Sequence, residues 1–272
     1  MVVKYLFFEC PGNPSPFRGI MNIMKNEGKN DVSLEFRAVT KRFGVVSAVR
    51  DLRLSIRAGE IYGLIGPNGS GKTTTVKMAA GLYHPTAGSV RVRGTDMTLS
   101  PSKAKQFIGY IPDDPAAYDR LSGREFLEFV GEIRSMDRRE RDRRIEALLG
   151  EFGIADMANG AFGTYSRGSK QKISIIAALL HSPQVLLVDE PMVGLDPESA
   201  RVTLRLFSEF AHQGGAILLS THSLPMAEKI CNRFGMLKNG KLIAEGTPKE
   251  LSVLVGHAGT LEDSYLALAG GA

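Results

Sequence analysis

Cysteine, tryptophan and long apolar runs are scarce or missing in this chain of 272 residues. It has no tryptophan, and its two cysteines, Cys10 and Cys231, lie far apart in the sequence. That pattern argues against metal or disulfide chemistry at cysteine and indicates a reducing, cytosolic setting. No apolar run approaches the roughly 20 residues that a membrane-spanning helix requires. We therefore expect a chain located in the cytoplasm.

Positive charge is present but not concentrated enough to indicate a nucleic-acid-binding protein. The net charge is +5, and no nucleic-acid partner is expected. The densest basic segment, residues 134–144, has the sequence RSMDRRERDRR. Its interleaved acids are typical of a solvated helix face, and a contact with a partner or with lipid headgroups is the alternative.

The N-terminal residues 1–31 differ from the rest of the chain. An apolar start is followed by the breaker-rich sequence CPGNPSP at residues 10–16. The weakly basic start and the lack of a small-residue cleavage site argue against a signal peptide. We expect a disordered extension over residues 1–31, most of which translation from Met21 or Met24 would remove.

The most informative segment is residues 66–73, GPNGSGKT, which match the phosphate-binding loop pattern. A short apolar strand is predicted before the loop and a helix after it. Backbone N–H groups of such a loop surround phosphates, and the helix N-terminus adds its positive dipole end. We expect Lys72 to reach the β- and γ-phosphates and the Thr73 hydroxyl to bind Mg²⁺. The nucleotide-binding residues expected here are Gly66, Pro67, Asn68, Gly69, Ser70, Gly71, Lys72, Thr73 and Thr74.

Two further apolar strands end in residues suited to hydrolysis. The strand at residues 184–188 ends in Asp189 and Glu190, and the strand at residues 216–220 leads to His222. We expect Asp189 to hold Mg²⁺ through water and Glu190 to polarise or deprotonate the attacking water. His222 is expected to hydrogen-bond the γ-phosphate or to order the water.

These strands also indicate the fold class, which is α/β. Continuous apolar strands that alternate with helices predict a parallel sheet covered on both faces, as in a P-loop NTPase core. Alternating segments such as residues 48–57 predict an additional small antiparallel β subdomain. Helical periodicity predicts a helical subdomain at about residues 114–165 and a further helix over residues 170–181. We assign residues 32–272 to one nucleotide-binding domain.

Taken together, these segments resemble the nucleotide-binding subunit of an ABC transporter over residues 33–270. Residues 165–171, YSRGSKQ, occupy the place of the family signature, and residues 194–197, GLDP, match the loop after the catalytic glutamate. The resemblance implies that Ser166 and Gly168 contact ATP bound to a second copy of such a subunit. Those two residues are expected just before the helix over residues 170–181.

The resemblance also assigns roles to two residues outside these motifs. Phe43 occupies the place of the aromatic residue that stacks on adenine. Asp113 replaces the expected glutamine and would face Mg²⁺ or water with a charge on a shorter arm. Arg167 and Ser169 replace a glycine and a glutamine of the signature. Arg167 either adds positive charge near the γ-phosphate or points to solvent, and hydrolysis is expected to be retained.

The function implied by the resemblance is ATP hydrolysis coupled to transport. The end of the chain, residues 261–268, resembles exporter-type members that work with a separate permease. The expected partners are an integral membrane permease and a second ATP-binding subunit, in a homo- or heterodimer around two ATP molecules. Such a subunit would be peripheral on the inner face of the cell membrane. The alternatives are a soluble ABC-type ATPase acting on ribosomes or nucleic acid, and a small-molecule kinase that uses the same loop.

Overall fold

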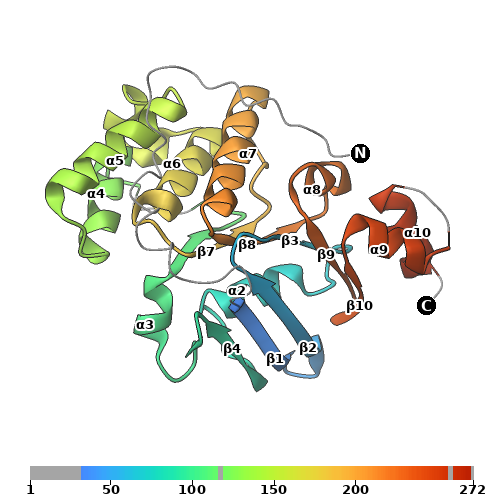
Figure 1. The fold of residues 1–272 in the computed structure, drawn as a ribbon. Coiled ribbons are helices and arrows are strands. Elements are labelled where there is room, and N and C mark those ends of the chain that lie inside the picture. The colour runs from blue at the N-terminus through green and yellow to red at the C-terminus, as the bar shows by residue number, and fades with distance from the viewer. Residues whose placement is uncertain (1–31, 116–118, 257–259, 271–272) are drawn as a thin grey trace.

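Two sheets and the helices packed around them form the part of the chain that the structure describes (Figure 1). The structure is a computed structural model and describes residues 32–115, 119–256 and 260–270. The expected disordered extension over residues 1–31 lies outside the described residues. Among the described helices, none has both the length and the apolar character to cross a membrane.

The smaller sheet is antiparallel and has the strand order β2-β1-β4-β5. Buried and exposed side chains alternate along its two long strands, β1 and β2, as expected for strands with one buried face. In β2 the side chains of Val49, Leu52, Leu54 and Ile56 are buried. The predicted antiparallel subdomain is thus confirmed. The strands are β1 (Val32–Phe43), β2 (Val46–Arg57), β4 (Ala87–Val92) and β5 (Thr95–Asp96).

The larger sheet has the order β10-β9-β3-β8-β7-β6, and its strands are parallel except for β10. Side chains of β3 alternate between two cores: Ile61 and Ile65 belong to one, and Tyr62 and Leu64 to the other. This confirms the predicted sheet covered on both faces. The strands are β3 (Ile61–Ile65), β6 (Ile108–Ile111), β7 (Val185–Asp189), β8 (Ala216–Thr221), β9 (Arg233–Lys238) and β10 (Lys241–Gly246).

Helices cover the larger sheet on both faces. Helix α2 (Lys72–Ala79) packs between the two sheets, and the opposite face is covered mainly by α6 (Arg167–Leu180) and α7 (Pro197–His212). Helices α4 and α5 pack on α6 at the side away from β9 (Figure 1). The remaining helices are α3 (Pro101–Gln106), α4 (Gly123–Ile133), α5 (Arg138–Glu151), η1 (Met157–Asn159), η2 (Phe162–Thr164), α8 (Leu224–Ile230), α9 (Pro248–Leu254) and α10 (Leu261–Gly270).

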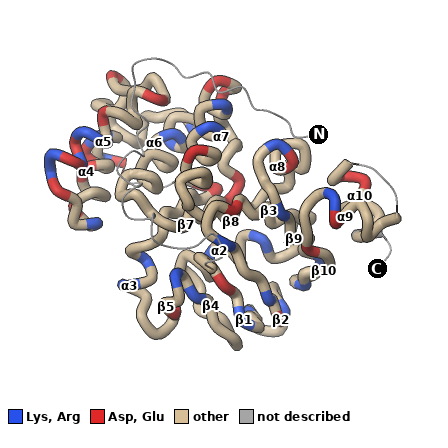
Figure 2. Tube along the Cα trace, viewed as in Figure 1, with Lys and Arg blue, Asp and Glu red and all other residues tan. Residues whose placement is uncertain are grey.

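The basic segment 134–144 is not simply a solvated helix face, so that expectation is wrong for part of it. Opposite charges are interspersed along α4 and α5 (Figure 2), but Arg141 and Arg144 are buried. Arg144 donates from Nε to the Leu180 carbonyl at 2.6 Å and from Nη2 to the Leu179 carbonyl at 2.9 Å. The last carbonyls of a helix have no intrahelical donor, so this arginine caps the C-terminal end of α6.

Candidate functional site

The phosphate-binding loop connects β3 to α2 in the predicted strand–loop–helix order. Gly71 precedes the helix with φ of 109°, and a Cβ there would lie 2.5 Å from the carbonyl oxygen of Ala48. Only glycine fits this close approach. The first N–H groups of α2 have no intrahelical partner, so they are available to an anion.

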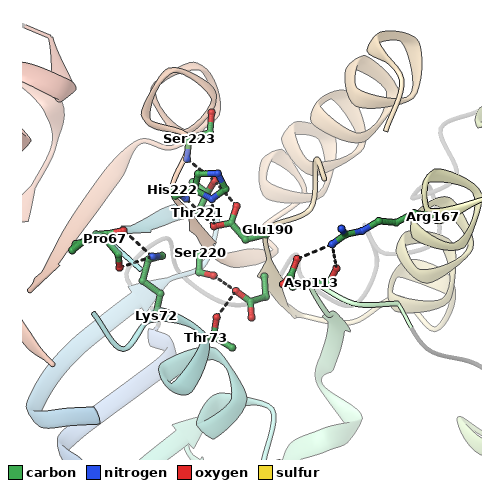
Figure 3. Close-up of polar contacts among 12 residues, drawn as sticks. Pro67, Lys72, Thr73, Asp113, Arg167, Glu190, Ser220, Thr221, His222 and Ser223 are labelled. Carbon is green, nitrogen blue, oxygen red and sulfur yellow. Dashed lines mark hydrogen bonds and ion pairs between the residues drawn. The ribbon is translucent and has the colours of Figure 1, made fainter. Parts of the chain in front are cut away.

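Lys72 is held inside the loop. Its Nζ donates to the Gly66 carbonyl at 2.7 Å and to the Pro67 carbonyl at 3.1 Å (Figure 3). The pKa of Lys72 is lowered, because the effect of burial is larger than the opposing effect of the negative charges of Glu190 and Asp189. The fold has therefore brought the two acids at the end of β7 close to the loop lysine, as the sequence predicted.

Asp189 is buried at the end of β7 and has one unused oxygen. Its Oδ1 accepts hydrogen bonds from the Ser220 hydroxyl and, at 3.2 Å, from the Thr73 hydroxyl. Its Oδ2 is buried without a hydrogen-bond partner among the described residues. Burial raises the pKa of Asp189, and the bonds from Ser220 and Thr73 oppose that rise. A buried carboxylate oxygen without a partner is costly, and a cation would satisfy it.

Glu190 is fixed by residues at the end of β8. Its Oε1 accepts from the backbone N–H and from the Nδ1 of His222, both at 2.8 Å, and its Oε2 accepts from the Thr221 hydroxyl at 3.0 Å. Because a carboxylate only accepts, Nδ1 carries the proton in this contact. The Nε2 atom of a neutral His222 can then accept from water but can donate to a phosphate only as an imidazolium. Both expected roles of His222 stay predictions.

The signature segment begins α6, and one expectation about it is wrong. The helix starts at Arg167, three residues earlier than predicted, because the Ser166 hydroxyl accepts from Ser169 N at 3.1 Å and caps the helix. Gly168 therefore lies in the first turn rather than before the helix. A Cβ at Gly168 would lie 2.3 Å from the Gly194 carbonyl oxygen, so glycine is needed for this contact.

Asp113 lies after β6, and its carboxylate contacts Arg167 (Figure 3). The Nη2 atom of Arg167 is 3.4 Å from Oδ1 of Asp113, and both side chains are about half exposed. Arg167 thus makes a contact that neither of the two alternatives for it included. The assignment of Asp113 as a metal ligand stays a prediction.

Phe43 ends β1 and is 45% exposed. Its ring packs edge-on against Tyr83 at 5.3 Å between centroids, and Lys41 Nζ lies 4.9 Å from the Phe43 centroid. A partly exposed aromatic ring that is held by neighbouring side chains can stack on a flat aromatic base. Tyr83 and Lys41 were missed by the sequence analysis, because no motif marks either of them.

Three further site residues were not predicted as functional. Ser220 and Thr221 hold the two acids, and their place directly before His222 at a strand end was a usable signal. Tyr110 on β6 lies near Asp189 and Asp113. Burial, followed by the negative charges of these two residues, raises the pKa of Tyr110 to about 12. It was missed because nothing in the sequence relates it to β7.

A phosphate-binding loop after β3, together with a buried acid and a second, tethered acid at the end of β7 in the same parallel sheet, defines a P-loop ATPase. The ABC transporter family model matches residues 49–193. The chain belongs to the ABC transporter family, as an ATP-binding subunit with the fold of an ATPase cassette.

Relatives and a solved structure give the extent of this similarity. The linearmycin resistance ATP-binding protein LnrL of Bacillus subtilis (strain 168) is 34% identical over 223 residues, which cover 82% of this chain and 72% of LnrL. The probable multidrug ABC transporter ATP-binding protein YbhF of Escherichia coli (strain K12) is 34% identical over 237 residues, 87% of this chain, but this chain spans only 41% of YbhF. A solved ATP-binding subunit of an ABC transporter is 32% identical with a TM-score of 0.84, covering 87% of this chain and 99% of that one.

Proposed function

We propose that this chain hydrolyses ATP to power export through a separate integral membrane permease. The observation that carries the proposal is the placement of Glu190, which His222 and Thr221 hold next to Asp189 and within the electrostatic field of Lys72. A carboxylate held in this way can accept a proton from the attacking water. The proposed catalytic residues are Glu190, His222 and Lys72.

Mg²⁺ fits the residues at the end of β7. The unpartnered Oδ2 atom of Asp189 and the neighbouring Thr73 hydroxyl would hold the ion, with Asp113 as a third proposed ligand. Magnesium is usually bound through one or two carboxylates together with the phosphates of the substrate. When bound, it would neutralise negative charge on the β- and γ-phosphates. Asp189 and Thr73 would orient it against the loop that holds those phosphates.

The ATP site is proposed to be completed by a second subunit. Ser166 and Gly168 lie at the start of α6, where free N–H groups favour an anion. In Figure 3, Arg167 of the same turn lies on the far side of Glu190 from Lys72. This placement supports contact between the signature of one chain and the ATP held by the loop of another. The proposed nucleotide contacts also include Phe43 for adenine, and the loop residues 66–74 for the phosphates.

Export is supported by the names of the relatives. LnrL is a linearmycin resistance protein and YbhF is a probable multidrug transporter subunit. Both names suit removal of a compound from the cell. We place this chain on the cytoplasmic face of the membrane, bound to its permease, because ATP is supplied there.

The experiment is dimerisation of the Glu190→Gln variant, measured by light scattering after gel filtration. With ATP and Mg²⁺ the variant should bind ATP, hydrolyse it poorly and accumulate as a dimer, because the γ-phosphate contacts persist. The matched control, Lys72→Ala combined with Glu190→Gln, should stay monomeric under the same conditions. A monomer in both cases would contradict the homodimer, and co-purification with ribosomes instead of a membrane protein would contradict the transport function.

A further inference from the structure

Two charged residues that depart from the family pattern meet in the structure. Asp113 follows β6, and Arg167 begins α6. The Nη2 atom of Arg167 lies 3.4 Å from both the Oδ1 atom and the backbone oxygen of Asp113. Figure 3 shows Asp113 between Glu190 and Arg167, and β6, which precedes Asp113, is the neighbour of β7 in the sheet. Because these two residues both differ from the family pattern and contact each other, they suggest one shared role.

Asp113 lies within electrostatic reach of the buried acid at the end of β7. Strands β6 and β7 pair in parallel with Ile111 opposite Val188, so Asp113 and Asp189 follow neighbouring strand ends at one edge of the sheet. Two carboxylates within electrostatic reach repel each other unless a cation offsets their charge. The guanidinium of Arg167 is one such cation, and a divalent ion bound at Asp189 would be another.

The start of α6 is tied more firmly to the loop after β7 than to Asp113. The Gln171 side chain is buried and donates to the Pro191 carbonyl at 3.2 Å, and Lys172 pairs with Asp196 at 3.0 Å. The contact between Arg167 and Asp113 is longer, and the exposed fractions of the two side chains are 54% and 52%. Exposed ion pairs are weak, so this contact is the one that can exchange.

We propose that Arg167 is a positioning residue for Asp113, and that it competes with the divalent cation beside Asp189 for the Asp113 carboxylate. The inference rests on the proposed function, because the cation enters with ATP. Once the cation takes the carboxylate, the guanidinium is released next to Ser166, at the helix end that favours anions. Nucleotide binding in one chain thereby changes the charge that α6 presents to a second chain.

The test is the Mg²⁺ dependence of ATP binding, followed with a fluorescent ATP analogue in a Glu190→Gln background that prevents turnover. Arg167→Ala removes the competitor and should lower the half-saturating Mg²⁺ concentration by about two- to fivefold, the scale of an exposed ion pair. Arg167→Lys keeps the charge and should lie close to the parent value. Arg201→Ala, which removes an exposed arginine of α7, should leave the value unchanged.

The Asp113→Asn variant decides whether Arg167 acts through Asp113. In that background, Arg167→Ala should produce no further shift. The inference is overturned if Arg167→Ala has no effect, or if its effect is as large with asparagine at position 113. Failure of the parent to bind ATP at any Mg²⁺ concentration would instead refute the proposed function itself.

Discussion

Replacement of His222 tests how the proposed roles at the attacking water are divided between His222 and Glu190. Among the described residues, the His222 side chain makes one of three hydrogen bonds to the Glu190 carboxylate, and the other two come from the His222 backbone and from Thr221. His222→Ala therefore leaves Glu190 in place but less firmly held. We expect a smaller loss of ATPase activity than in Glu190→Gln.

The magnitudes follow from the contacts. A hydrogen bond to a charged group contributes about 1.5–3 kcal/mol. The His222 side chain is 63% exposed, so the lower end applies, and the rate should fall about tenfold. Loss of the proton acceptor itself in Glu190→Gln should reduce the rate by about two to four orders of magnitude.

The assay is phosphate release at saturating MgATP, with ATP affinity measured separately. If His222 acts through Glu190, adding His222→Ala to Glu190→Gln should change the rate very little. His212→Ala, which alters an exposed histidine at the end of α7, is the control and should match the wild type. A further tenfold loss in the double variant would refute this reasoning and assign His222 an independent contact with the phosphate.

Three other predictions concern binding and stability. Lys72→Ala should abolish ATP binding in calorimetry, and normal turnover would disprove the site. Phe43→Ala should weaken ATP binding by about 1 kcal/mol, the low end for a stacked base, whereas Phe43→Tyr should retain it. Burial lowers the pKa of His181 to about 3, so below about pH 6.5 the unfolded chain binds a proton that the folded chain excludes. The free energy of unfolding measured in urea should fall by about 2 kcal/mol between pH 7.5 and 5, and by less in His181→Gln. Equal losses in the two proteins would contradict the lowered pKa of His181.

Local patterns were sufficient wherever one stretch of chain carries the information. The loop at residues 66–73, the acids that end β7 and His222 after β8 were all predicted, because parallel strands bring their carboxyl ends to one edge of the sheet. The prediction was wrong at the start of α6, where a serine cap extends the helix over Arg167 and Gly168. It was also wrong for the buried arginines of α5: the carbonyls on α6 that accept from Arg144 lie far away in the sequence, and Arg141 pairs with Glu132 on another helix.

The amino-acid pattern alone therefore specified the class of the site: a phosphate-binding loop, two acids at the end of one strand, a histidine after the next strand and a signature segment. It did so because each of these is a short segment whose backbone geometry depends on its own residues. Only the tertiary structure showed which groups hold the acids, how Tyr83 supports Phe43, and that Asp113 meets Arg167. These contacts join segments far apart in the chain, and their distances are set by the packing of the sheet and helices rather than by any local pattern.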